Sequence, residues 1–259
     1  MEKICIKNRK GLKICVVVEQ NPKQIGLVFL IHGLSGAKEQ PQIRVVAETF
    51  FDKDFTVVTF DTSNTFGESE GQFEDSTVTT HYEDLEDVIT WAKKQVWYQE
   101  PFVLEGHSLG GISVLLYAEK YPKEILALAP ISTLVSGKLR LEAYEKYSKE
   151  MLEEWKKTGW RITESKTFPG VIKKLPWSHM EDNFKYDTIP EAHKLTMPVL
   201  LVVSEIDKST PLEAINVLYQ ALPAEKELHV IKNDEHTFRG AIQLQELRNI
   251  FSAWIDKII

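Results

Sequence analysis

The stretch GHSLGG at residues 106–111 constrains the fold of this chain more than any other feature of the sequence. It follows a short apolar run, 102–104, and precedes ten residues whose apolar side chains recur with helical spacing. A serine between a strand and a helix fits the G-x-S-x-G nucleophile elbow. In that turn Gly106 and Gly110 leave room for neighbouring backbone, and Ser108 is strained with its hydroxyl at the helix N-terminus. The helix dipole and free amides there favour an anionic intermediate.

Apolar runs that read as strands alternate with amphipathic helices along most of the chain. Such alternation predicts an α/β fold with a mostly parallel sheet and helices on both faces. The first two strands are joined by a short polar turn and add an antiparallel hairpin at the edge. Eight strands are predicted, at residues 3–7, 12–19, 25–31, 55–60, 102–104, 125–130, 198–203 and 227–231.

The alternation lapses between residues 136 and 194. Residues 138–157 read as one charged amphipathic helix, and the remainder is irregular and rich in aromatic residues. We interpret 136–194 as a cap inserted over one end of the sheet, in a single domain, 1–259, whose core comprises 1–135 and 195–259. The aromatic residues favour an apolar or aromatic ligand group, although packing of the cap on the sheet would equally explain any one of them. No basic residue of the segment can be assigned to a carboxylate clamp from the sequence.

Composition and charge exclude several classes of protein. The 259 residues are 43% hydrophobic and 27% charged, which suits one large globular domain. The net charge of −7 gives no basic surface for nucleic acid. No apolar run is long enough for a membrane span or a signal peptide, so we expect a cytoplasmic protein. Cys5 and Cys15 are expected to be two buried thiols facing each other across the hairpin. The sequence does not fix the oligomeric state, monomer or homodimer.

The serine pattern alone fits a plain glycine-rich turn equally well, so its meaning depends on a base and an acid elsewhere. In elbow proteins the acid and then the histidine follow the serine in the chain. After the strand at 198–203 only His229 and His236 remain. His229 lies inside the last predicted strand, whereas His236 follows it in a polar loop and is therefore the candidate base. Asp207 is the preferred acid because it lies further into the loop after its strand than Glu205.

An oxyanion hole needs backbone amides directed at the developing negative charge. The amide of Leu109, directly after the serine, is one candidate. The amide of Leu34 is the other, in the loop HGLSG at 32–36 that follows a buried strand. The other histidines show no metal-ligand spacing, and we expect neither a metal nor an organic cofactor. Four further polar residues near these motifs are interpreted as structural: His32, Asp61, His107 and Asp234.

Together these motifs resemble the α/β-hydrolase fold serine hydrolases over nearly the whole chain. The sequence is most similar to small carboxylesterases, including cinnamoyl and feruloyl esterases, and also resembles monoacylglycerol lipase-like and serine aminopeptidase-like enzymes. It departs from them at DTSNTFGES, 61–69, where relatives usually have a shorter Asp-x-x-Gly-x-Gly-x-Ser loop. The matching parts are HGLSG at 32–36, GHSLGG at 106–111, SEID at 204–207 and DEH at 234–236.

The resemblance implies a serine esterase that cleaves small to medium, apolar or aromatic carboxylic esters through an acyl-enzyme on Ser108. A lipase of monoacylglycerols ranks lower because the sequence lacks an obvious exposed apolar helix. An aminopeptidase would need an acidic group that receives the substrate amine. A slow-turnover receptor for a small ligand is the alternative from another class, because fold does not dictate function.

Overall fold

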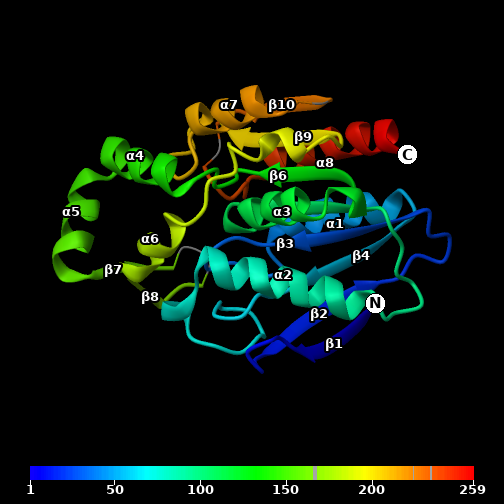
Figure 1. Ribbon diagram of the computed structural model, residues 1–259, viewed down its shortest axis with the longest axis horizontal. Coiled ribbons are helices and arrows are strands. Elements are labelled where there is room, and N and C mark those ends of the chain that lie inside the picture. The colour runs from blue at the N-terminus through cyan, green and yellow to red at the C-terminus, as the bar shows by residue number, and fades with distance from the viewer. Residues whose placement is uncertain (166–167, 224, 234) are drawn as a thin grey trace.

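A computed structural model describes residues 1–259 except 166–167, 224 and 234. Its central sheet contains eight strands (Figure 1). They are β1 Glu2–Lys7, β2 Lys13–Glu19, β3 Gly26–Ile31, β4 Phe55–Phe60, β5 Phe102–His107, β6 Ile125–Ile131, β9 Val199–Ser204 and β10 Lys226–Ile231. The spatial order is β1-β2-β4-β3-β5-β6-β9-β10, and β2 is the one strand of this sheet that runs antiparallel to the other seven. The predicted mostly parallel, eight-stranded sheet is confirmed.

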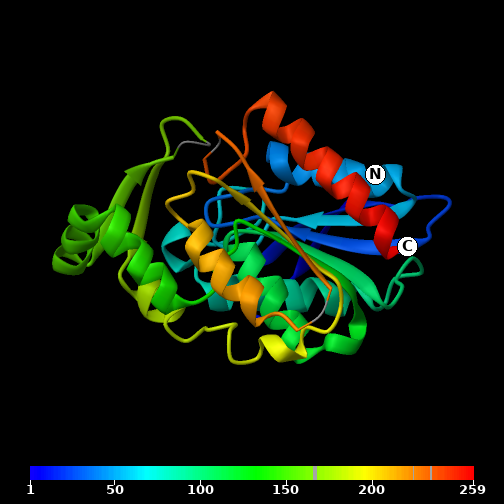
Figure 2. The same ribbon diagram turned by 90° about the horizontal axis from the view of Figure 1, so that it is seen from above.

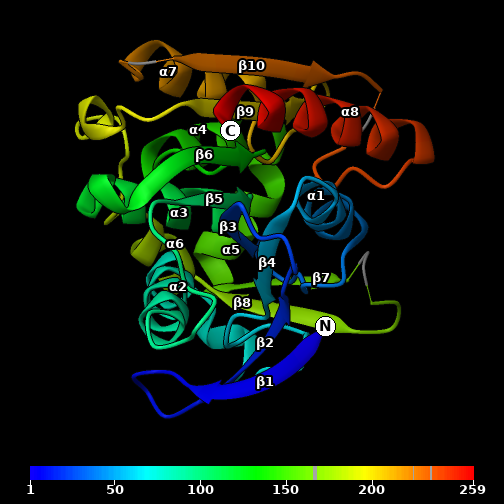
Figure 3. The same cartoon turned by 90° about the vertical axis from the view of Figure 1, so that its right-hand side faces the viewer.

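Helices cover both faces of the sheet, also as predicted (Figure 3). The helices of the sheet layers are α1 Pro41–Asp52, α2 Val78–Ala92, α3 Leu109–Lys120, α7 Leu212–Ala221 and α8 Ala241–Ile258, with short 3-10 turns η1 Phe73–Asp75 and η2 Pro122–Glu124. Side chains of α2, α3 and α7 form one core layer, and those of α1 and α8 form the other. Alternate residues of β3 enter alternate layers, Phe29 the first and Leu30 the second, because successive side chains of a strand point to opposite faces.

The segment 136–194 lies between β6 and β9 and projects beyond one end of the sheet (Figures 1 and 2). It contains α4 Gly137–Tyr147, α5 Lys149–Thr158, β7 Trp160–Glu164, β8 Ile172–Pro176, α6 Ser178–Asn183 and η3 Ala192–Lys194. In the described residues β7 and β8 pair with each other and with no strand of the main sheet. Near the base of the segment, Ser136 and Asp187 form an isolated bridge.

The expected single helix over 138–157 is wrong. Ser148, at φ −151° and ψ 40°, ends α4 and precedes α5. Its amide donates to the Tyr144 carbonyl, and its own carbonyl accepts the amide of Leu152. Serine suits such a junction because its side chain favours helix ends over helix interiors.

The N-terminal hairpin has the predicted register, with Cys5 opposite Cys15. Their sulfur atoms are 3.4 Å apart and both thiols are free. Cys15 is buried, but the expectation of a buried Cys5 is wrong because β1 is an edge strand and leaves this side chain exposed. None of the helices in the described part of the chain is long and apolar enough to span a membrane.

Candidate active site

Ser108 occupies the one-residue turn between β5 and α3. Its φ of 57° and ψ of −111° lie outside the ordinary regions for a residue with a side chain, so the turn is strained. The Ser108 amide donates to the Ile131 carbonyl at the end of β6, which fixes the turn to the sheet. A Cβ at Gly106 would overlap the carbonyl oxygen of Gly110, so this position requires glycine. The result is a serine hydroxyl held at the N-terminus of α3.

His236 lies against Ser108, although 128 positions separate the two residues in the chain. The Ser108 hydroxyl oxygen is 2.8 Å from Nε2 of His236. On the other side of the ring, Nδ1 is 2.7 Å from Oδ2 of Asp207. With a proton on Nδ1, the imidazole donates to Asp207 and accepts the serine proton at Nε2. The three predicted residues therefore form one continuous hydrogen-bond chain.

Asp207 is 4% exposed and is surrounded by donors. Its Oδ1 accepts the amides of Ser209 and Thr210 at 2.8 and 3.0 Å, and the Thr210 hydroxyl lies 2.8 Å from Oδ2. Burial by itself would raise the pKa of Asp207, but the attraction of His236 and these hydrogen bonds lower it below its usual range. Asp207 is thus an anion directed at the ring of His236. Glu205, the other candidate acid, is exposed.

Thr210 is a site residue that sequence reasoning missed. A threonine three positions after an aspartate can bond back to it with both its amide and its hydroxyl, so the spacing of Asp207 and Thr210 was the available signal.

His107 holds the backbone of the His236 loop. Its Nε2–H donates to the His236 carbonyl at 2.8 Å, and the two rings lie 4.9 Å apart. Burial, with a contribution from nearby His236, lowers the pKa of His107 to about 3, so the ring is neutral. A neutral ring with a proton on Nε2 makes this contact without adding a second positive charge beside the candidate base.

The loop after β3 comes close to Ser108. A Cβ at Gly33 would lie 2.8 Å from Cβ of Ser108, so only glycine permits this approach. His32 braces the loop, donating from Nδ1 to the Gly33 carbonyl and accepting the Thr62 amide at Nε2. Within the described residues, the amides of two positions beside Ser108 donate to no acceptor: Leu34 and Leu109.

A buried lysine ties this loop to the longer loop 61–69. Nζ of Lys38 donates to Asp61 at 2.6 Å and to Glu68 at 2.8 Å, and the Lys38 amide also donates to Asp61. Burial would lower the pKa of Lys38, but the ion pairs with Asp61, Glu39 and Glu68 raise it. Asp61 thus lies in a bracing network. Asp234, the other aspartate interpreted as structural, lies outside the described residues.

The remaining histidines do not form a second site. His229 lies within β10, with Nε2 3.2 Å from Glu227. Burial lowers the pKa of His81 to about 3 and that of His179 to about 4, so both rings are neutral. No group of three or more potential metal ligands occurs in the part of the chain that the structure describes.

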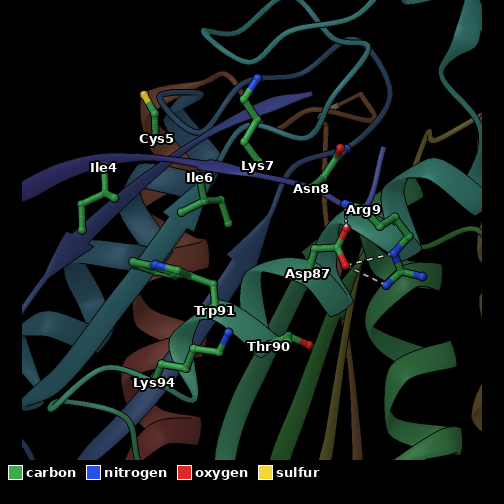
Figure 4. A pocket seen from close by; sticks show the side chains of 10 residues that line it. All are labelled: Ile4, Cys5, Ile6, Lys7, Asn8, Arg9, Asp87, Thr90, Trp91 and Lys94. Carbon is green, nitrogen blue, oxygen red and sulfur yellow. Dashed lines mark hydrogen bonds and ion pairs between the residues drawn. The ribbon is translucent and has the colours of Figure 1, made fainter. Parts of the chain in front are cut away.

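A surface hollow of about 510 Å³ lies between β1 and α2 (Figure 4). It contains none of the candidate site residues. Among the cations that line it, Arg9 is already paired with Asp87 and Glu86. The lining thus places the hollow apart from Ser108, Asp207 and His236.

The chain matches known proteins in both sequence and structure. A family model described as alpha/beta hydrolase fold matches residues 26–161, more than half of the chain. An uncharacterized 31.7 kDa protein of the traX-finO intergenic region of Escherichia coli is 28% identical, and the match covers 97% of each chain. Est1E from Butyrivibrio proteoclasticus, solved with ferulic acid bound, is 23% identical over 98% of each chain, with a TM-score of 0.77. Alpha/beta hydrolase domain-containing protein 10 from mouse is 18% identical over 100% of each chain, with a TM-score of 0.79. At these identities the two structures establish likeness of fold alone.

Proposed function

The chain belongs to the alpha/beta hydrolase fold family, and from this premise we propose that it is a serine esterase for small to medium, apolar or aromatic carboxylic esters. The observation that carries the proposal is the hydrogen-bond chain from Ser108 through His236 to Asp207. A serine hydroxyl is a weak nucleophile at neutral pH, and this arrangement is the one that activates it.

In the first half of the reaction, Oγ of Ser108 attacks the ester carbonyl while Nε2 of His236 takes the hydroxyl proton. Asp207, kept ionised by its donors, orients the ring and stabilises the imidazolium. The amides of Leu34 and Leu109 receive the negative oxygen of the tetrahedral intermediate. His236 then protonates the departing alcohol, and the acyl group stays covalently bound to Ser108.

In the second half, His236 removes a proton from water, and the resulting nucleophile attacks the acyl-enzyme. The same two amides stabilise the second tetrahedral intermediate. Collapse of that intermediate returns the proton to Ser108 and releases the carboxylic acid. The cycle balances with one water consumed for each ester cleaved and uses no metal or organic cofactor.

We assign the segment 136–194 the role of a cap over the ester. Support comes from its aromatic cluster, in which Tyr144 and Trp155 are buried and against which Leu34 of the oxyanion loop packs. Phe66, from the loop after β4, stacks on Phe73 at 4.7 Å beside the same cluster. The partly buried side chains packed against this cluster, Leu34 and Phe66 among them, favour esters with an apolar or aromatic acyl or alcohol group. Ferulic acid, the molecule bound by Est1E, is an aromatic acid of that kind.

One observation favours a second candidate, a lipase of monoacylglycerols. The outer face of the β7–β8 hairpin exposes three large apolar side chains, Trp160, Ile162 and Ile172, at 44%, 61% and 55%. Such a face suits contact with a lipid aggregate. A lipase would show a sharp rise in rate when a monoacylglycerol exceeds its critical micelle concentration, whereas an esterase would follow ordinary saturation.

A panel of p-nitrophenyl and methyl esters with graded acyl length and aromaticity tests the proposal. We expect saturable hydrolysis by the parent protein, with a preference for acyl groups of small to medium size. Ser108→Ala should lose this activity. If the parent binds the esters but releases acid no faster than the Ser108→Ala protein, the chain is a receptor and not an esterase.

A further inference from the structure

Two arginines of the segment 136–194 converge on one tyrosine. Arg140 on α4 donates from Nη2 to the Tyr144 hydroxyl at 2.9 Å, and Arg161 on β7 donates from Nη1 to the same oxygen at 2.6 Å. Tyr144 is buried, and both guanidinium groups also lie over its ring, at 4.7 and 5.8 Å from the centroid. Two cations therefore share one neutral acceptor.

Neither guanidinium forms an ion pair with a carboxylate of the described residues. By contrast, Arg9, Arg44 and Arg248 each pair with carboxylates in this chain of net charge −7. Both arginines are only partly buried. A carboxylate from a ligand would supply the anionic partner that the described residues do not.

Further donors at this cluster lack a partner. Nε of Arg161 is buried and bonds to no described atom. The Tyr144 oxygen accepts from both arginines, and no acceptor among residues 1–165, 168–223, 225–233 and 235–259 takes its own hydrogen. The cluster therefore combines a surplus of donors with a surplus of positive charge.

The field of the two cations acts on neighbouring groups. Burial would raise the pKa of Tyr144, but Arg140 and Arg161 outweigh it and lower that pKa. Both arginines also lower the pKa of His179, although burial is the larger cause there. These effects agree with positive charge that the protein leaves uncompensated.

The cluster adjoins the candidate active site from two sides. Nη1 of Arg140 donates to the Ser209 carbonyl at 2.5 Å, and the Ser209 amide donates to Asp207. On the other side, the guanidinium of Arg161 lies 5.0 Å from the Trp155 ring, which belongs to the aromatic cluster that Leu34 contacts. Arg140 therefore lies where the segment 136–194 meets the loop of Asp207, and Arg161 lies against the aromatic cluster that Leu34 contacts.

We propose that Arg140 and Arg161, with the Tyr144 hydroxyl, receive a carboxylate at the end of the substrate remote from the scissile ester. The substrate class is then the half-esters of dicarboxylic acids, in which the alcohol or the chain between the two carboxyl groups is the apolar or aromatic part. This specificity rests on the proposed esterase function. A guanidinium presents a planar fork of N–H groups that matches the two oxygens of a carboxylate. The Tyr144 hydrogen supplies a further donor to the same group.

Binding without turnover tests this assignment independently of catalysis. The Ser108→Ala protein is titrated calorimetrically with monomethyl glutarate and monomethyl adipate, and with the neutral analogues in which an amide replaces the free carboxylate. A charge-assisted contact predicts that at least one acid binds about 10- to 150-fold more tightly than its amide. Equal affinity for acid and amide at both chain lengths would overturn the assignment, whether or not the parent cleaves esters.

Substitutions then locate the preference. In the Ser108→Ala background, Arg161→Gln should lower the acid-to-amide ratio. Arg161→Lys should lower it less, because lysine keeps the charge but loses the planar fork of donors. Arg248→Gln on α8 is the matched control and should keep the parent ratio. Should Arg161→Gln prove unfolded by circular dichroism, Tyr144→Phe tests the same contact. A ratio that survives both substitutions would place the carboxylate elsewhere.

In the protein with Ser108 intact, kcat/KM should be higher for the half-esters with a free carboxylate than for their amide analogues. This ratio should follow the ratio of the two affinities measured in Ser108→Ala. A parent that binds the acids selectively but cleaves neither ester refutes the esterase and leaves the carboxylate site standing. If the parent cleaves the neutral amide esters faster than the half-esters with a free carboxylate, the proposed esterase function stands and the half-ester specificity is refuted.

Discussion

Glu105→Gln tests the protonation state of a buried carboxyl group in β5, the strand that leads to Ser108. Glu105 lies in the middle of β5, opposite Leu30 of β3 and Ala129 of β6. Its side chain is 0% exposed, and neither carboxyl oxygen has a hydrogen-bond partner among the described residues. Burial raises the pKa of Glu105 well above 4.5, because a carboxylate here would lose its hydration and gain nothing in return. Native Glu105 therefore keeps its proton to a higher pH than an exposed glutamate does.

The sign of the pH effect follows from proton binding. Above pH 4.5 an unfolded Glu105 has lost its proton, whereas the native residue keeps it. The native state then binds one more proton than the unfolded state, so the free energy of unfolding falls by about 1.4 kcal/mol per pH unit until the native pKa is reached. Glutamine keeps the shape and cannot ionise, so Glu105→Gln lacks this loss.

Urea denaturation of the parent and of Glu105→Gln at pH 5.5, 6.5 and 7.5 measures the effect. We expect the difference in free energy of unfolding, variant minus parent, to increase with pH, by about 1 kcal/mol per pH unit while native Glu105 keeps its proton. Glu145→Gln, an exposed glutamate on α4, is the control and should run parallel to the parent. Parallel curves for the parent and Glu105→Gln would refute a neutral acid at this position.

Four further substitutions examine the loops around Ser108. In an ester assay, Asp207→Asn should lower kcat by about 10⁴, as substitution of a triad acid does in general. Glu205→Gln, at an exposed position, should leave kcat unchanged. The reverse result would assign the acid to Glu205. Gly33→Ala adds a Cβ 2.8 Å from that of the nucleophile, so we expect kcat to fall by about 100-fold or more in a folded protein, and an unchanged rate would remove this loop from the oxyanion hole. Lys38→Met leaves buried Asp61 without its cation and should cost about 3–5 kcal/mol of stability by urea denaturation, and a loss below about 1 kcal/mol would show that the ion pair does not fix the loop.

Much of the fold and of the site geometry could be predicted because both follow from the order of local patterns. Strands and helices alternate in the chain, and the carboxyl ends of parallel strands meet at one edge of the sheet. A serine after β5, an acid after β9 and a histidine after β10 therefore had to lie near one another, and Ser108, Asp207 and His236 do. Their catalytic roles stay predictions until activity is measured.

The segment 136–194 could not be predicted in the same way. Its β7–β8 hairpin exposes large apolar residues, so the usual rule that such residues face a core gave no strand signal there. The meeting of Arg140 and Arg161 depends on how α4, α5 and that hairpin fold back on one another, which no local pattern encodes. Thr210 and His107 act through contacts with their neighbours, and a sequence shows the residue but not the contact.

The most direct test of the central claim is covalent labelling of the nucleophile. A fluorophosphonate reacts with a serine only where a base activates it and an oxyanion hole receives the phosphoryl oxygen. Intact-mass spectrometry after reaction should show one label per chain, and peptide mapping should place that label on Ser108. Labelling should disappear in Ser108→Ala and slow strongly in Asp207→Asn. A protein that takes up no label, or that carries it on another residue with Ser108 unmodified, would contradict the assignment of Ser108 as the nucleophile.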